Sequence, residues 1–174
     1  MIFRVLTFVV VCGLGIGACA DPTARPTEGA NAVVATIVDG DTIDVTIAGR
    51  SERVRLLGID TPESVDRDRP VQCYGTEATV RLGELVPVGT SVLLVRDIEP
   101  RDRFDRLLAY VFRGDDGLFV NEVMVAEGFA DVLVIDPNDA YAADLRQARA
   151  AARDGDRGLW GACGGPDVPV DAPE

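Results

Sequence analysis

The stretch "AVVATIVDGDTIDVTIA", residues 32–48, decides the fold class that the sequence predicts. In its second half, apolar side chains alternate with polar ones, which is the two-residue period of a half-buried strand. The apolar positions are Ile43, Val45 and Ile47. Asp39 and Gly40 separate this run from an earlier apolar run, and Asp-Gly between such runs is a strong signal for a β-hairpin. Asp41 shares the parity of the apolar positions, so we expect its carboxylate at the mouth of the core.

Three more strands and three helices are predicted downstream of the hairpin. The strands lie at 52–59, 91–98 and 106–112, and the helices at 76–86, 121–127 and 140–153. The irregular apolar pattern of the first of these strands predicts a kink near Gly58. We expect Thr76 and Asn121 to cap the first two helices, and we expect the third helix to stop at Gly155.

This order of elements predicts an α+β fold that is mainly β. The architecture that fits is a five-stranded Greek-key barrel of the OB type with three packed helices, over residues 31–163. Such barrels bind oligonucleotides, sugars or proteins, so the fold alone does not decide the function.

Both ends of the chain differ in composition from the predicted domain. Residues 1–18 combine one positive charge with a short apolar run and small residues, which is typical of an export signal. The segment "IGAC" looks like a bacterial lipobox, in which Cys19 would carry a lipid, and an ordinary secretory peptide is the alternative. Residues 19–30 are predicted to form a flexible tether, and residues 164–174 a disordered tail. We therefore expect an exported chain, lipid-anchored on the extracytoplasmic face of the cell membrane or, alternatively, secreted.

Export also decides what we expect of the cysteines. Cys12 leaves with the signal and Cys19 takes the lipid, so that Cys73 and Cys163 remain in an oxidising compartment. We predict a disulfide between these two residues. The loop that it closes, of about 90 residues, would add on the order of 4 kcal/mol of stability in the chain-entropy picture.

The composition excludes several kinds of chemistry. The chain has no histidine and no lysine, which removes imidazole acid–base catalysis, Ser-His triads, His-ligated zinc and Schiff bases. Its net charge of −12 argues on its face against a nucleic-acid partner, although an acidic surface also simply favours solubility.

Acidic side chains stand at the ends of the predicted strands. They are Asp39, Asp41, Asp60 and Glu63, and the barrel connectivity would bring their turns to one rim. Four carboxylates would repel one another at short range, and a hard divalent cation with oxygen ligands, Ca²⁺ or Mg²⁺, would resolve the conflict. The alternative for "VDGDT" is a turn with Asx hydrogen bonds and no metal.

Two arginines are candidates for the same rim. Guanidinium groups of Arg55 and Arg106 beside a carboxylate-bound cation would form a receptor for a phosphate diester. The alternative is that these arginines make ordinary salt bridges with Asp60 and Asp102.

The chain from residue 31 to 163 resembles the thermonuclease family, the staphylococcal-nuclease-like calcium-dependent nucleases. Six segments in the same order carry the resemblance: "VDGDT", "RLLGIDTPE", "CYGTEA", "DRFDRLLAYV", "VNEVMVAEG" and "RGLWGAC". The resemblance implies an OB-type barrel with three helices and cleavage of phosphodiester bonds in DNA and RNA, single-stranded or denatured DNA included. It also implies a disulfide between Cys73 and Cys163 and, by extension, a monomer.

The resemblance assigns roles to individual residues. It implies that Asp41, Asp60 and the backbone carbonyl of Thr61 are ligands of Ca²⁺, with Mg²⁺ as the less favoured ion, and that Asp39 lies close behind them. It implies that Glu63 activates or positions water, and that Arg55 and Arg106 clamp the phosphate.

The sequence departs from the family pattern in three places. Where relatives place tyrosines that stack on a base, this chain offers "DVLVIDPND", which puts Val134 and Asp136 at those positions, with Phe104 and Tyr110 as possible substitutes. Asp105 stands where relatives often have glycine. The basic surface loop of well-known members is here "ESVDRDRPVQ", of mixed charge, which predicts weak substrate binding at high salt. The missing tyrosines predict a lower affinity, and a non-catalytic OB-type binding module at the cell surface stays the alternative to an enzyme.

Overall fold

The structure is a computed structural model that describes residues 29–64 and 71–170. The predicted export signal at 1–18, the lipidation site Cys19 and most of the tether lie outside the described residues. Within those ranges, no helix is both long enough and apolar enough to cross a membrane.

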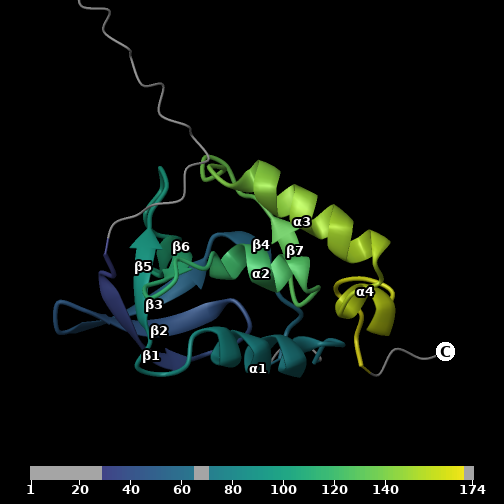
Figure 1. Cartoon of the computed structure of the whole chain (residues 1–174), viewed down its shortest axis with the longest axis horizontal. Helices are drawn as coiled ribbons and strands as arrows, with labels where there is room; N and C mark the ends of the chain where they lie inside the picture. The colour runs from purple at the N-terminus through teal and green to yellow at the C-terminus, as the bar shows by residue number, and fades with distance from the viewer. Residues whose placement is uncertain (1–28, 65–70, 171–174) are drawn as a thin grey trace, which may run out of the picture.

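Five strands close into a barrel in the order β1-β2-β3-β6-β5 (Figure 1). The strands are β1 (Ala32–Ile37), β2 (Thr42–Ile47), β3 (Arg50–Leu56), β5 (Ser91–Val95) and β6 (Leu107–Arg113). Their pairs are antiparallel except for β3 and β6, which run parallel. The predicted OB-type α+β fold is thereby confirmed.

The predicted kink at Gly58 divides what the sequence suggested was a single strand. Gly58 has φ +75°, in the left-handed region that favours glycine. Before it, β3 ends in the barrel; after it, β4 (Gly58–Asp60) leaves the barrel and pairs with β7 (Asp131–Leu133) in a separate two-stranded sheet. The turn redirects Asp60 away from the line of β3.

In the described part of the chain four helices accompany the barrel, one more than predicted. They are α1 (Gly75–Leu85), α2 (Val120–Ala126), α3 (Ala142–Asp154) and the short α4 (Leu159–Ala162). Helix α2 contacts both α1 and α3, and Figure 1 shows it between them beside the barrel. Gly155 ends α3 as expected.

The two predicted helix N-caps are wrong. Tyr74 and Phe119 precede α1 and α2 without side-chain capping bonds, so that Thr76 and Asn121 lie inside the helices. Asn121 is fully buried, and its side chain donates to the Leu57 carbonyl at 2.8 Å and accepts from the Val111 amide at 2.9 Å. A buried amide needs such partners, and here they tie α2 to the barrel.

An aromatic cluster joins the barrel to the helices. Its members come from β6 and from the residues just before α2 and α3: Tyr110, Phe112, Phe119 and Tyr141. Ring centroids in the cluster are as close as 4.6 Å, the range in which aromatic pairs attract beyond simple burial.

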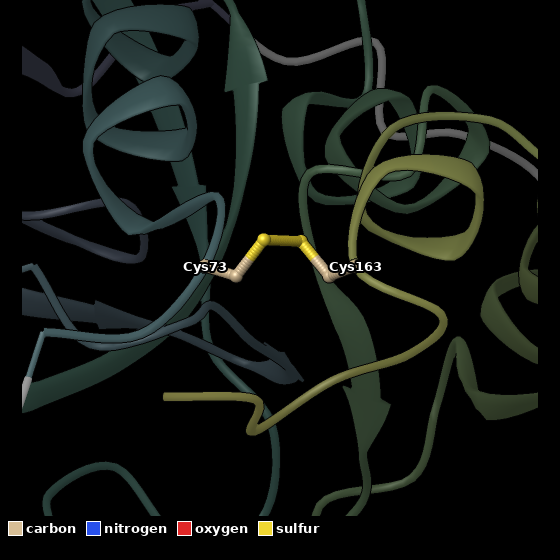
Figure 2. Close-up of a disulfide and its surroundings, with 2 residues drawn as sticks. All are labelled: Cys73 and Cys163. Carbon is tan, nitrogen blue, oxygen red and sulfur yellow. A yellow bond between two sulfur atoms is a disulfide. The ribbon is translucent and has the colours of Figure 1, made fainter. Parts of the chain in front are cut away.

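The predicted disulfide between Cys73 and Cys163 is present (Figure 2). Beyond it, residues 164–170, which we call the C-terminal strap, were expected to be disordered. The strap instead turns back along the chain at 71–73, where the Cys73 amide donates to the Val168 carbonyl at 2.7 Å. Residues 171–174 lie outside the described part of the chain.

Replacing Gly58 tests whether the turn after β3 needs glycine. A Cβ on Gly58 would lie 2.5 Å from Cδ1 of Leu145, whereas a Cβ on Gly49, also at positive φ, meets nothing within 4 Å. Gly49→Ala should therefore cost only the left-handed strain, about 1–2 kcal/mol. Gly58→Ala should lower the free energy of unfolding by the same strain and by about 1–3 kcal/mol more, because its Cβ overpacks against Leu145. Urea unfolding of both variants measures the difference, and equal losses would contradict the steric argument.

Candidate functional site

An acidic pocket of about 200 Å³ lies where the β1–β2 turn, the end of β3, strand β4 and the loop before β6 meet. The residues that line it are Asp39, Asp41, Arg55, Asp60, Thr61, Pro62, Glu63, Gln72, Arg106 and Asp167. Every residue that the sequence assigned to the metal or the reaction is therefore in one place. Five carboxylates face two guanidinium groups, which leaves an excess of negative charge in the pocket.

Asp41 is the buried centre of this pocket. Its side chain accepts hydrogen bonds from the Thr61 amide at 3.1 Å and from the Thr61 hydroxyl at 3.2 Å. Burial raises the pKa of Asp41 to about 6; the Arg55 guanidinium opposes the rise, and the nearby carboxylates of Asp39 and Asp60 add to it. A bound cation would stabilise the charged form of this carboxylate.

Arg55 connects two of the carboxylates. Its guanidinium lies 3.0 Å from the Asp41 carboxylate and 2.6 Å from that of Asp60, and it donates to the carbonyl of Ile59 at 2.9 Å. In a straight strand Arg55 and Asp60 would face opposite ways, and the turn at Gly58 removes that conflict. The Arg55–Asp60 salt bridge that the sequence allowed as an alternative is thus part of the same pocket.

Asp39 holds the hairpin turn in addition to lining the pocket. Its carboxylate accepts from the Asp41 amide at 3.0 Å, which is the Asx hydrogen bond that the alternative reading of "VDGDT" expected. The turn and the carboxylate site are therefore compatible, because one oxygen of Asp39 fixes the backbone that presents Asp41.

Arg106 enters the pocket from the loop before β6. Asp102 accepts from the Arg106 side chain at 2.7 Å and from its amide at 2.9 Å, so the alternative salt bridge is present here too. Burial alone would raise the pKa of Asp102, but these bonds and one from the Phe104 amide lower it. Asp105 adopts φ +64°, a conformation that Asp tolerates, so the turn forms without glycine.

Glu63 lines the pocket beside these groups, and its main chain pairs with Gln72. The Glu63 amide donates to the Gln72 side-chain oxygen at 2.6 Å, and the Gln72 amide donates to the Glu63 carbonyl at 2.8 Å. The carboxylate therefore projects from a backbone that is held on both sides.

The donor set suits a hard cation. Within residues 29–64 and 71–170, no group of three or more Asp, Glu, His or Cys side chains is arranged to hold a metal ion. The predicted ligands Asp41 and Asp60 are two carboxylates, and the Thr61 carbonyl supplies a third oxygen. Oxygen donors completed by water or substrate are what Ca²⁺ and Mg²⁺ prefer, and the raised pKa of Asp41 fits a carboxylate that a cation would stabilise.

A second, more apolar pocket of about 540 Å³ shares Arg55 and Arg106 with the acidic pocket. Leu133 and Ile135 line it, whereas Val134 and Asp136, the positions expected in place of stacking tyrosines, do not. Phe104 also lines it and is 65% exposed, with the guanidinium of Arg103 4.7 Å from its ring centre. Tyr110, by contrast, is buried in the core.

Sequence reasoning missed three residues that shape these pockets. Asn138 is buried and exchanges two hydrogen bonds with the backbone of Glu99, which joins opposite walls of the apolar pocket. Gln72 and Asp167 line the acidic pocket. For Asp167, the sequence signal was the alternation of Val168 and Val170, but a pattern this short does not predict a strand.

The chain is an OB-type barrel that gathers carboxylates and arginines in one surface pocket. Residues 53–162 match the family described as staphylococcal nuclease homologue. The chain belongs to this family.

Individual relatives agree with the family match. The chain is 38% identical over 133 residues to the thermonuclease of Staphylococcus intermedius, covering 76% of this chain and 77% of that protein. It is 35% identical over 127 residues to the thermonuclease of Staphylococcus hyicus, covering 73% of each. It is 37% identical over 135 residues to endonuclease YncB of Bacillus subtilis, covering 77% of this chain and 63% of that protein.

Replacing Asp41 by Asn should remove a pH-dependent loss of stability from the metal-free protein. The pKa of Asp41 rises from 3.8 to about 6 on folding, so the folded state binds the proton more tightly and loses stability as pH rises toward and through 6. Asp41→Asn removes that loss, and at every pH it also removes one carboxylate partner of Arg55. The free energy of unfolding of the variant relative to the parent should therefore rise by about 1–2 kcal/mol between pH 5 and pH 8 in chelator. A difference that does not vary between pH 5 and 8 would refute it.

Proposed function

We propose that this chain is a calcium-dependent nuclease that acts outside the cytoplasm and hydrolyses phosphodiester bonds of DNA or RNA by attack of water. The observation that carries the proposal is the partly buried Arg55 guanidinium, which is bonded to Asp41 and Asp60 in a pocket that Glu63 and Arg106 also line. The relatives named thermonuclease and endonuclease support the same activity.

The two arginines bind the scissile phosphate in this proposal. A guanidinium presents parallel N–H donors that match two phosphate oxygens. Arg106 is the more exposed of the two and is held by Asp102 from one side, so its remaining donors are available to an incoming phosphate. As negative charge grows on the phosphoryl oxygens, both groups stabilise it in place.

Glu63 orients or deprotonates the attacking water. A carboxylate in hydrogen-bond reach of water can accept its proton as the new bond forms. The pairing of its main chain with Gln72 limits the positions that this carboxylate samples.

Asp41, Asp60 and the Thr61 carbonyl would hold the cation, with Asp39 supporting the turn behind them. A bound Ca²⁺ polarises a phosphoryl oxygen and offsets the excess of carboxylates, and Mg²⁺ is the alternative because it prefers the same ligands. The Thr42 hydroxyl and the Thr61 amide donate hydrogen bonds to the Asp41 carboxylate, and these bonds keep it facing the pocket.

The substrate in this proposal is a flexible strand, single-stranded or denatured DNA or RNA, bound by a monomer. Its phosphate lies between the arginines while a base enters the apolar pocket against Leu133, Ile135 and Phe104. Aliphatic side chains give less stacking energy than the roughly 1–3 kcal/mol per base that an aromatic ring provides. Binding should therefore depend largely on the contacts of the arginines with phosphate, and such contacts weaken at high salt.

Hydrolysis of denatured DNA by the full chain tests this function. With Ca²⁺ at low salt the parent should be active, and a chelator should abolish the activity. Glu63→Gln should lower kcat by about 10²–10⁴-fold, the usual contribution of a general base. Glu77→Gln is the matched control, because Glu77 is exposed on α1 outside the pocket and should retain full activity.

Two results would redirect the proposal. Activity with Mg²⁺ alone would change only the cation. Binding of nucleic acid, glycan or protein without hydrolysis under any metal would favour the alternative, a non-catalytic OB-type module at the cell surface, which the net charge of −12 also favours.

We also propose that Cys19 carries a lipid that anchors the chain on the extracytoplasmic face of the membrane, with the residues up to 30 as a tether. The lipobox-like "IGAC" supports this placement. The full chain expressed in a bacterium should sediment with membranes, and Cys19→Ser should move it to the soluble or secreted fraction. An identical distribution of parent and variant would indicate an ordinary secretory peptide.

A further inference from the structure

The C-terminal strap ends against the acidic pocket. The disulfide to Cys73 holds Cys163, the residue that precedes the strap, and Figure 2 shows the chain beyond Cys163 passing beneath the bond toward the side of Cys73. From there it pairs with 71–73: the Val168 carbonyl accepts from the Cys73 amide at 2.7 Å, and the Val170 amide donates to the Val71 carbonyl at 3.1 Å. Residues on either side of Gln72 are therefore bonded to the strap.

Gln72 links the strap to Glu63. Its side-chain oxygen accepts from the Glu63 amide at 2.6 Å, and its side-chain nitrogen donates to the Asp167 carboxylate at 3.2 Å. One amide group thus spans from the strap to the backbone of the proposed general base. Gln72 and Asp167 both line the acidic pocket.

The backbone on the other side of Glu63 has little room to move. The first residue of α1 is Gly75, and a Cβ there would lie 2.5 Å from the Glu63 carbonyl oxygen. The same carbonyl accepts from the Gln72 amide at 2.8 Å. The Glu63 main chain is therefore confined between the start of α1 and the segment that the strap covers.

We propose that the strap positions Glu63 for reaction, with Gln72 and Asp167 as the positioning residues. The proposal rests on the proposed function, because positioning matters only if Glu63 acts on water. A reacting group must stay within about 0.5 Å of its productive place, and supporting hydrogen bonds achieve this. The chain thus uses residues beyond the barrel to complete its active pocket.

Variants of the link separate positioning from stability. Gln72→Ala removes both bonds and should lower kcat about tenfold while KM stays within about twofold, since the loss of one supporting hydrogen bond corresponds to roughly that factor. Gln72→Glu alone places a carboxylate opposite Asp167 and should also be impaired. In the double variant Gln72→Glu/Asp167→Asn, residue 72 keeps an acceptor for the Glu63 amide, and the new amide at residue 167 can donate to residue 72. The kcat should therefore recover.

Shortening the chain provides an independent test. A chain that stops after Gly165 keeps the disulfide but loses the pairing at 168–170, and its kcat should fall as much as that of Gln72→Ala. Adding Gln72→Ala to the shortened chain should cause no further loss, because both changes break the same link. A chain that stops after Val170 keeps every strap bond described here and is the matched control, with parent activity expected.

Three outcomes would overturn the inference. They are parent kcat in the chain that stops after Gly165, multiplicative losses in the combined variant, or a lower melting temperature with unchanged kcat at 25 °C, which would mark the strap as purely stabilising.

A parent chain that hydrolyses nothing would instead refute the proposed function. Hydrogen exchange then still tests the strap, because the Glu63 amide should exchange faster in the shortened chain than in the control. Equal protection in the two chains would refute the strap's role without reference to activity.

Discussion

The structure depends on the partly buried guanidinium of Arg55. Its side chain is only 14% exposed, and it holds Asp41 and Asp60 through ion pairs of 3.0 and 2.6 Å. A charge in such a place is costly unless it is paired and hydrogen-bonded. The barrel, the turn at Gly58 and strand β4 are arranged so that these partners reach it. Arg55 therefore links the fold to the candidate site, because its partners are also the proposed cation ligands.

Much of this arrangement could be predicted, because the deciding patterns are local. The alternation in β2 and the Asp-Gly turn predict the hairpin, and the parity of Asp41 predicts its buried carboxylate. The broken pattern before Gly58 predicts the bend that lets Asp60 meet Arg55. Each of these patterns depends on side-chain direction within a few residues, which the sequence specifies directly.

The errors arose where long-range contacts decide the outcome. Asn121 reads as a helix cap, but its amide is needed by two backbone groups of the barrel, so it lies inside α2. Leu133 at the end of β7 and Ile135 just after it line the apolar pocket, whereas the sequence pointed to Val134 and Asp136 as the positions that replace stacking tyrosines. A shift of one residue exchanges the two faces of an extended chain. The partner of Gln72 comes from a segment 95 residues away, and no local pattern could indicate that contact.

The parallel pairing of β3 with β6 has a consequence for when activity begins. Arg55 pairs with Leu108 across these strands, and Arg106 immediately precedes β6, so the two arginines meet only after a long intervening loop has closed. Contacts so distant along the chain form late in folding. An unfinished polypeptide would consequently carry both of the arginines proposed to bind phosphate without being able to use them together.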